Sequence, residues 1–280
     1  MRSYLAAASL GRLSVAEVRA FPTSPRPSPP QWGGEGVFFW GVVVTAAALP
    51  PVAILAGGLA TRMRPYTERV PKALLEVAGE PFIAHQLRLL QCQGVTKVVL
   101  CLGYLGEQVV DFVGDGSRFG LEVEASFDGD VLLGTGGALK RALPLLGDSF
   151  FVLYGDSYLV VPMAEIWARF RAAGQPALMT VYRNEGRWDT SNVVYDGDRV
   201  AYYSKRDRRP DMAYIDFGLG LLTKGLFAAY PEGQVFDLAE LYSDLAASGR
   251  LAGWESRQRF YEIGTPEGLA DTDRFLKAGQ

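Results

Sequence analysis

Apolar runs and amphipathic stretches alternate along most of the chain. Apolar or alternating runs predict strands over 52–56, 98–102, 121–126, 150–154 and 177–182. Between and after them, apolar residues at helical spacing predict helices over 81–93, 105–113, 138–146, 163–173 and 267–277. Strands that alternate with helices need crossover connections, which place helices on both faces of the sheet. We therefore predict an α/β protein with a mixed, mostly parallel, Rossmann-like sheet flanked by helices.

The pattern is less regular after Asp156. Short strands predicted over 193–195 and 200–203 flank Asp196-Gly197-Asp198, which is a typical hairpin turn composition. We therefore expect an antiparallel hairpin at this point of the sheet.

The first fifty residues differ from the rest. Residues 22–36 hold five of the 16 prolines without apolar periodicity, which is typical of a linker or a disordered segment. No charged residue occurs between Glu35 and Arg62. A membrane span is not expected there, because Pro50-Pro51 interrupts the run and residues 37–49 are too short to cross a bilayer. A signal peptide is disfavoured because Glu35 stands where positive charge is usual.

Two explanations of this segment remain open. Residues 1–50 are either a disordered extension or a mis-annotated one, in which translation starts at a GTG codon read as Val42, Val43 or Val44. In both cases we expect residues 51–280 to form the catalytic domain, of a size that fits a single α/β domain.

Composition excludes several classes of function. The 280 residues carry 28 Lys+Arg and 31 Asp+Glu, a net charge of −3, so a nucleic-acid partner is not expected. Two cysteines cannot make a disulfide framework, which indicates a reducing compartment, and we expect the cytoplasm. The single histidine, His85, makes a Ser-His-Asp triad improbable. Homo-oligomerisation stays open.

The strongest chemical signal follows the first predicted strand. The segment L-A-G-G-L-A-T-R-M-R-P spans residues 55–65, and P-K-A-L-L spans residues 71–75. Small residues after a strand let backbone N–H groups approach phosphate oxygens closely. Arg62 and Lys72 supply the positive charge that a triphosphate needs. The segment is neither a Walker A loop nor the Rossmann fingerprint, because the Gly-Lys-Ser/Thr and G-x-G-x-x-G patterns are absent.

This segment resembles the signature L-A-G-G-x-G-T-R-L-x-P-L-T, followed by P-K-P-L-L, of the sugar-1-phosphate nucleotidylyltransferases. Ala60 and Ala73 depart from it, since the family usually has Gly and Pro there. If position 60 needs a positive φ, its methyl group would shift the loop or weaken nucleotide binding. The resemblance implies a GT-A-like nucleotidyltransferase fold, with NTP and a sugar 1-phosphate as partners. It gives catalytic roles to Arg62, Lys72 and Asp156.

A second glycine-rich segment, L-G-T-G-G-A at residues 133–138, is similar to the loop that packs against base and ribose in this family. Together the two segments imply a set of nucleotide-binding residues. These are Leu55, Ala56, Gly57, Gly58, Thr61, Gly134, Thr135 and Gly136.

Two carboxylates are candidates for metal binding. Asp156 ends a predicted buried strand, where open α/β sheets place their ligands, and the family uses this Asp for Mg²⁺. Glu262, in Y-E-I-G-T-P, stands where the family has its second Asp. The resemblance therefore implies a Mg²⁺ cofactor held by Asp156, with Glu262 as the second candidate ligand.

Sugar-side residues are implied by three further segments. Lys205 aligns with a family Lys that contacts the sugar phosphate, and Asp216 and Gly218 fall in a segment like the sugar-facing Asn-x-Gly. Asn192 falls in a third sugar-side segment.

The implied reaction is attack by a sugar 1-phosphate oxygen on the α-phosphorus of an NTP, which releases pyrophosphate. Phosphate is already nucleophilic at neutral pH, so no general base is needed, in agreement with a chain that has one histidine. GTP with a manno-hexose or heptose 1-phosphate is the first expectation, and UTP with an amino-sugar 1-phosphate is the alternative.

Two other classes stay open. Asp128–Asp130 and Asp196–Asp198 resemble the D-x-D metal motif of GT-A-like glycosyltransferases, although Asp-Gly more commonly marks a turn. The Arg62 and Lys72 pair disfavours this class, because such enzymes do not handle pyrophosphate. A catalytically weakened nucleotide-sugar sensor is suggested by Ala60 and Glu262.

Overall fold

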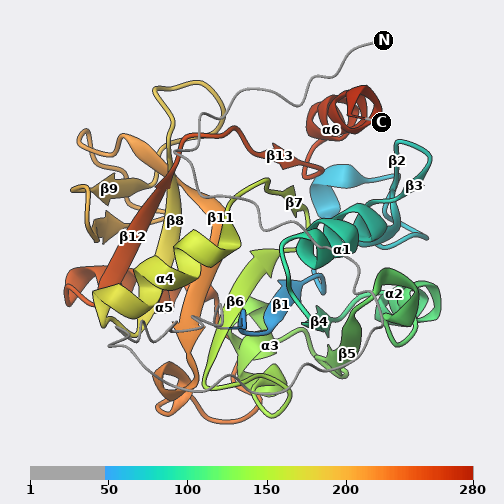
Figure 1. Cartoon of the computed structure of the whole chain (residues 1–280), viewed down its shortest axis with the longest axis horizontal. Coiled ribbons are helices and arrows are strands. Elements are labelled where there is room, and N and C mark those ends of the chain that lie inside the picture. Colours follow the sequence, from blue (N-terminus) through green and yellow to red (C-terminus); the bar gives the residue numbers. More distant parts are fainter. Residues whose placement is uncertain (1–47, 280) are drawn as a thin grey trace, which may run out of the picture. The chain divides into compact units, whose positions relative to one another are not determined.

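The computed structural model describes residues 48–279, so the expectations for residues 1–47 lie outside the described residues. Its centre is a parallel block of four strands, β6 (Ser149–Tyr154), β1 (Val52–Leu55), β4 (Lys97–Leu102) and β5 (Glu122–Phe127), in that spatial order. β1 pairs in parallel with both β4 and β6 (Figure 1). The four strands were predicted from their apolar patterns, and the predictions are confirmed.

An antiparallel half extends this block through β11 (Tyr214–Thr223). β11 runs antiparallel to β6 on one edge and to β8 (Ala177–Arg183) on the other, and its first residue, Tyr214, also pairs with β9 (Val193–Tyr195). β10 (Val200–Tyr203) forms the predicted hairpin with β9, while β12 (Leu251–Ser256) adds in parallel to β8. The sheet is thus mixed, as predicted, with β11 joining its two halves.

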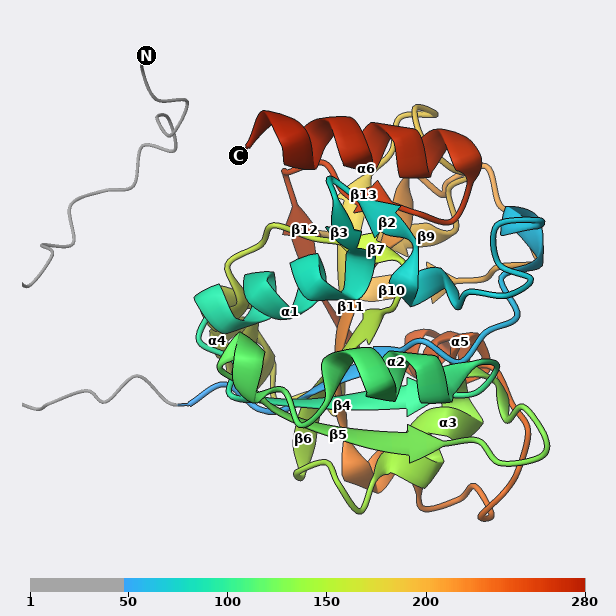
Figure 2. The same ribbon diagram turned by 90° about the vertical axis from the view of Figure 1, so that its right-hand side faces the viewer.

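Helices cover both faces of the sheet. α1 (Phe82–Cys92), α2 (Gly106–Val113) and α4 (Met163–Ala173) share one apolar core with the strands. α3 (Gly134–Ala142) and α5 (Leu238–Ala247) share a second core with alternate strand residues. Figure 2 shows α1 and α2 on one side of β4 and β5, and α3 on the other. Neighbouring strand residues enter opposite cores, as Ala53 and Ile54 do, because successive strand side chains point to opposite faces.

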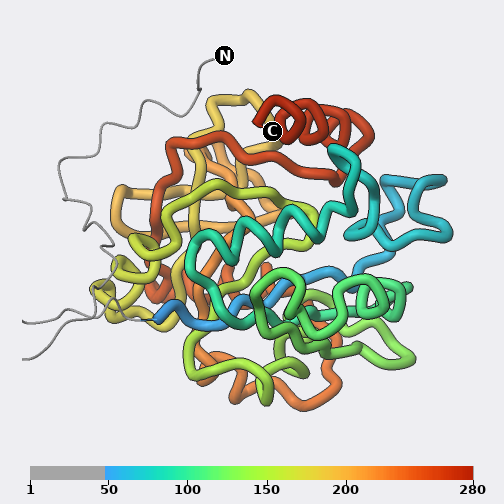
Figure 3. The backbone as a smooth tube through the Cα atoms, turned by 45° about the vertical axis from the view of Figure 1, so that its right-hand side comes forward, coloured from blue at the N-terminus to red at the C-terminus, as the bar shows by residue number. Residues whose placement is uncertain are grey.

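A smaller subassembly lies beyond the carboxyl ends of the central strands. It contains the ribbons β2–β3 (Glu76–Val77, Glu80–Pro81) and β7–β13 (Ser157–Tyr158, Tyr261–Glu262), together with α6 (Pro266–Ala278). Val77, Phe82 and Ile263 form its buried core. Figures 2 and 3 both show α6 beside the β2–β3 ribbon, where Ala78 N donates to Asp273 Oδ1 at 2.8 Å. This subassembly brings the chain's C-terminal segment to the end of β6.

The structure corrects the sequence prediction in two respects. The helix predicted over 138–146 begins earlier, at Gly134, so the second glycine-rich segment forms its first turn. β11, α5 and β12 were not predicted at all. Within residues 48–279, no helix is both long enough and apolar enough to cross a membrane.

We predict that Gly136→Ala lowers stability, because the added methyl group in the first turn of α3 would clash with Phe236. A methyl group at this position would lie 2.2 Å from Phe236 Cε2, so the buried Phe236 ring would have to move. Overpacking of this kind costs roughly 1–3 kcal/mol of unfolding free energy, measurable by urea denaturation. Gly225→Ala is the matched control, because no atom lies within 4 Å of its added methyl group. Equal stability of both variants would contradict the prediction.

Candidate functional site

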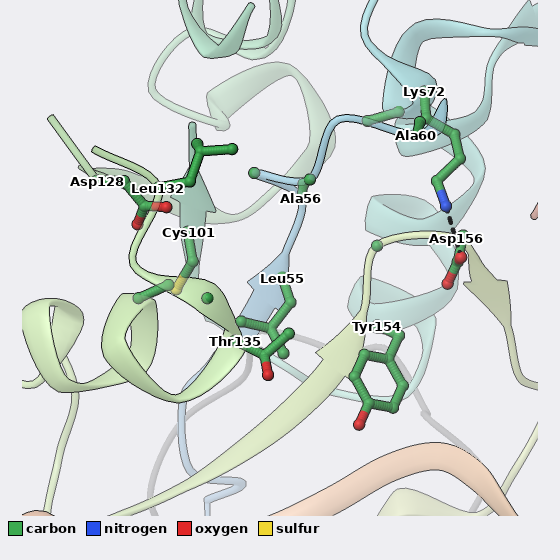
Figure 4. A pocket seen from close by; sticks show the side chains of 16 residues that line it. Leu55, Ala56, Ala60, Lys72, Cys101, Asp128, Leu132, Thr135, Tyr154 and Asp156 are labelled. Carbon is green, nitrogen blue, oxygen red and sulfur yellow. Dashed lines mark hydrogen bonds and ion pairs between the residues drawn. The ribbon is translucent and has the colours of Figure 1, made fainter. Parts of the chain in front are cut away.

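A pocket of about 240 Å³ opens where the parallel strands β1 and β6 end. We name it the glycine-loop pocket, since residues 55–58 and Ala60 form one wall. Lys72 and Asp156 lie at one end of it in Figure 4, with Asp128 and Leu132 at the opposite end. The carboxyl edge of a parallel sheet is the usual ligand position in such folds.

Close backbone packing creates this wall. A methyl group on Gly57 would lie 2.8 Å from Gly103 N, and one on Gly155 would lie 2.6 Å from Leu55 O. Gly155 N also donates to Leu55 O at 3.0 Å. Larger residues would push the strand ends apart, so glycine at these two positions is a geometric requirement.

Ala60, the departure from the family signature, adopts a left-handed conformation with φ 48°. Its carbonyl oxygen accepts two hydrogen bonds, from the buried Thr67 hydroxyl at 3.0 Å and from Met63 N at 2.9 Å. These bonds hold the loop in a conformation that an L-residue rarely adopts. The concern that position 60 needs a positive φ is thus correct for this loop.

Lys72 and Asp156 form the central ion pair of the site. Lys72 Nζ lies 2.6 Å from Asp156 Oδ2, and both side chains are about one-fifth exposed (23% and 21%). Lys72 comes from the 3₁₀ turn Lys72–Leu74, and Asp156 follows β6. The chain folds so that residues 84 positions apart neutralise each other beside the pocket.

Glu262 lies next to this pair. The β7–β13 ribbon pairs Glu262 with Ser157, and Ile263 N donates to Asp156 O at 2.9 Å. A methyl group on Gly264 would lie 3.2 Å from Glu262 Oε2 and 3.5 Å from Asp156 Oδ2, so both carboxylates face Gly264. Burial, and then the charge of Asp156, raise the pKa of the Glu262 carboxyl, while the charges of Arg62 and Lys72 oppose this rise.

Two carboxylates that face one point suit a hard divalent cation. No group of three or more His, Cys, Asp or Glu residues gathers as a metal site anywhere in residues 48–279. A cation bound here would therefore take its remaining ligands from substrate or water, as Mg²⁺ commonly does.

Three residues at the far end of the pocket were not predicted: Cys101, Asp128 and Leu132. Asp128 is buried, its Oδ2 accepts from Leu133 N at 3.0 Å, and burial raises the pKa of its carboxyl. Burial also raises the pKa of the Cys101 thiol to about 12, so this thiol stays neutral. From the sequence, Asp128 was interpreted as part of a D-x-D metal motif or, more commonly, a turn, and it was not predicted to line a pocket after β5.

The predicted nucleotide-binding residues do not all reach the pocket. Six of them line it, namely Leu55, Ala56, Gly57, Gly58, Gly134 and Thr135. Thr61 is exposed on the 3₁₀ turn after Ala60 and does not line it. Gly136 packs against Phe236 instead, and its N–H donates to Phe236 O at 3.0 Å.

The predicted sugar-side residues form a hydrogen-bonded wall. Asp216 Oδ1 accepts from Gly218 N at 3.0 Å, and Asn192 Oδ1 accepts from Asp216 N at the same distance. Burial raises the pKa of the Asp216 carboxyl, whose Oδ2 lies 3.4 Å from Tyr154 Oη. Lys205 Nζ lies 5.8 Å from the centre of the Tyr154 ring. Tyr154 lines the glycine-loop pocket, so this wall adjoins it.

Arg62 lies outside the glycine-loop pocket. Its exposed side chain lines a second cavity with Glu262, Arg259 and residues of α6. Arg62 and Glu262 are near enough for the arginine charge to oppose the rise in the Glu262 pKa. Arg62 therefore acts on Glu262 from the second cavity rather than from the glycine-loop pocket.

His85 takes no part in this site. It is buried, and its Nε2 donates to Val77 O at 2.7 Å. Asp196-Gly197-Asp198 forms the expected turn between β9 and β10, with Asp196 Oδ1 accepting from Asp198 N and Arg199 N. Neither feature supplies a base or a metal site.

Comparison with known proteins agrees with this geometry. The model of the nucleotidyl transferase family matches residues 52–191, which contain the glycine loop, Lys72 and Asp156. The chain therefore belongs to the nucleotidyl transferase family.

Individual relatives cover most of the described chain. An N-acetylmuramate alpha-1-phosphate uridylyltransferase of Neisseria meningitidis serogroup B is 31% identical, over 76% of this chain and 92% of the relative. A mannose-1-phosphate guanyltransferase of Eremothecium gossypii is 33% identical, over 67% of this chain and 51% of the relative. The crystal structure of HddC from Yersinia pseudotuberculosis complexed with GMP-PN has a TM-score of 0.67 at 23% identity, covering 82% of this chain and all of that one.

We predict that Ala60→Gly stabilises the protein. The left-handed conformation costs an L-residue roughly 1–2 kcal/mol, and the greater freedom of glycine in the unfolded chain cancels part of that gain. The unfolding free energy should rise by up to about 1 kcal/mol, measured by urea denaturation.

Ala78→Gly is a matched control, because Ala78 has a φ of 51° in the β2–β3 turn, outside the pocket. It should give a similar gain, whereas Ala84→Gly within α1 should lower stability. A loss of stability in Ala60→Gly would contradict the assigned conformation.

Proposed function

We propose that the protein transfers a nucleoside monophosphate from an NTP to a sugar 1-phosphate, giving an NDP-sugar and pyrophosphate. The observation that carries this proposal is the Lys72–Asp156 pair at 2.6 Å, which joins the glycine-loop pocket to Glu262. The glycine loop suits phosphates, and a cation next to paired carboxylates suits a metal-bound triphosphate. The family and both named relatives support the same class of reaction.

Each charged residue has a place in this reaction. A sugar 1-phosphate oxygen attacks the α-phosphorus, and the bond from that phosphorus to the bridging oxygen of the β-phosphate breaks. Lys72 would hold the α-phosphate, Arg62 the leaving pyrophosphate and Lys205 the sugar phosphate. No proton needs to be removed from the nucleophile, so the engagement of His85 with Val77 O is compatible with the reaction.

Asp156 and Glu262 would hold the Mg²⁺ ion. When bound, Mg²⁺ neutralises phosphate charge and orients the reacting oxygens. Glu262 has a longer side chain than Asp, but its carboxylate still faces Gly264 together with that of Asp156, so the substitution keeps the two carboxylates close to each other.

Asp128 favours guanine as the base. Its Oδ1 accepts no hydrogen bond from the described residues, whereas Oδ2 accepts from Leu133 N. Guanine presents two neighbouring N–H donors on one edge, which match a carboxylate acceptor. Uracil presents one N–H between two carbonyl oxygens, and these would face the carboxylate unfavourably. We therefore propose GTP, with a manno-configured sugar 1-phosphate as the first acceptor, as in the name of the Eremothecium relative.

UTP with an N-acetylated amino-sugar 1-phosphate is the second candidate. It is favoured by the Neisseria uridylyltransferase, since the alignment covers 92% of that relative's length. A pyrophosphate-release assay with four NTPs and a panel of sugar 1-phosphates discriminates the two. Release with no pair would overturn the proposed reaction, and release with UTP only would overturn the base assignment.

We predict that Asp128→Asn weakens the preference for GTP. The amide oxygen can still accept from Leu133 N, but its NH₂ group then meets the guanine donors. Loss of such a contact in a buried site lowers kcat/KM for GTP roughly tenfold or more, while UTP is unaffected or improved. An unchanged ratio of kcat/KM for the two nucleotides would show that Asp128 does not read the base.

We predict that Arg62→Ala and Asp156→Ala each lower turnover by at least about a hundredfold, as expected for one lost preorganised charge. Arg69→Ala and Asp148→Ala are matched controls; Arg69 is exposed outside both pockets, and Asp148 precedes the other end of β6. Turnover should be measured at saturating substrate and Mg²⁺. Near-normal turnover of either site variant would refute the role given to that residue.

A further inference from the structure

One oxygen of Asp237 accepts two hydrogen bonds and forms one ion pair, with partners from three parts of the chain. Asp237 Oδ1 accepts from the Thr135 hydroxyl at 2.9 Å and from Ala239 N at 2.9 Å. Lys205 Nζ lies 3.5 Å from the same atom. Asp237 was not among the predicted site residues, since no helix was predicted where it begins α5.

Two of these contacts fix the carboxylate. Asp237 is the N-cap of α5, which accounts for the bond from Ala239 N. Thr135, in the first turn of α3, donates to Asp237 and accepts from Leu238 N at 2.8 Å. Because Thr135 also lines the glycine-loop pocket, the carboxylate is tied to the nucleotide side of the site.

The third contact concerns Lys205. This side chain is 42% exposed and follows β10 in a loop, so little packing restrains it. The charged and aromatic groups that face it are Asp237, the Asp216 carboxylate and the Tyr154 ring. Asp237 alone forms a direct ion pair with it among the described residues. The pair therefore directs the lysine toward the junction of the pocket and the sugar-side wall.

We infer that Asp237 is a positioning residue, which holds Lys205 in place for the sugar phosphate from an anchor on the nucleotide side. The inference rests on the proposed function and adds a residue to it. An exposed ion pair adds little to folding stability, so the effect of Asp237 should appear in use of the acceptor.

The variant Asp237→Asn tests this role. Asn is as good an N-cap as Asp, and its amide oxygen can still accept from Thr135 and Ala239 N, so only the negative charge that attracts Lys205 is lost. We expect kcat/KM for the sugar 1-phosphate that gives most product to fall about tenfold, which corresponds to about 1.4 kcal/mol. The KM for the NTP and the melting temperature should not change.

A double-mutant cycle separates positioning from a general effect. In a Lys205→Gln background, Asp237→Asn should have no further effect, because the side chain that it positions is gone. Glu240→Gln is the matched control, since Glu240 is exposed one turn into the same helix and forms no ion pair among the described residues. It should leave all parameters unchanged.

The remaining outcomes all count against the inference. A normal kcat/KM in Asp237→Asn, or a lower KM for the sugar 1-phosphate, would mean that Asp237 is only a cap or a competitor for Lys205. Additive effects in the cycle would also overturn it. In these cases the wild-type reaction still stands, whereas a wild type without turnover for any substrate pair overturns the proposed function and this inference together.

Discussion

The site depends on the ion pair between Lys72 and Asp156. Neither charge is well solvated, so each needs an opposite charge nearby while no substrate is bound. Glu262 adds a second carboxylate to the same point, and the charges of Lys72 and Arg62 act on that carboxyl as well. In the proposed reaction, a triphosphate with its divalent cation would bring a new partner for Lys72 and a new partner for the carboxylates. Substrate binding would thus replace the Lys72–Asp156 ion pair by contacts of each residue with the substrate or its cation.

Sheet topology places the members of this pair, and half of that topology could be predicted. In the first half, β1, β4, β5 and β6 are apolar runs separated by helices, so pattern alone defines them. β11 could not be recognised from pattern, because Gly218 and Gly220 interrupt it. A methyl group at Gly220 would lie 2.3 Å from Tyr242 Oη, on α5, which the sequence did not predict either. Packing against another segment therefore explains Gly220, and the positive φ of 94° explains Gly218; neither cause has a local sequence signature.

The candidate site also contains residues that could be predicted from the sequence and residues that could not. Lys72, Asp156 and the glycine loop carry short-range motifs, and the structure brings them together in one pocket. Asp128 and Asp237 carry no motif of this family, since Asp128 stands in an Asp-Gly-Asp triplet that more commonly marks a turn and Asp237 looks like an ordinary cap residue. Their place at the site follows from where β5 ends and α5 begins. Gly136 is the opposite case: it belongs to a motif that resembles the family's, but it packs against Phe236 and does not line the pocket.

Two departures from the family signature raised the alternative of a nucleotide sensor that has lost catalysis. Ala60 keeps the left-handed conformation that glycine adopts most readily, since Thr67 and Met63 both bind its carbonyl oxygen. Glu262 reaches the same point as Asp156 despite its extra methylene. A chain released from catalysis has no need to hold an alanine in a costly conformation beside a pocket or to keep two carboxylates together. The geometry at both departures therefore favours the enzyme over the sensor.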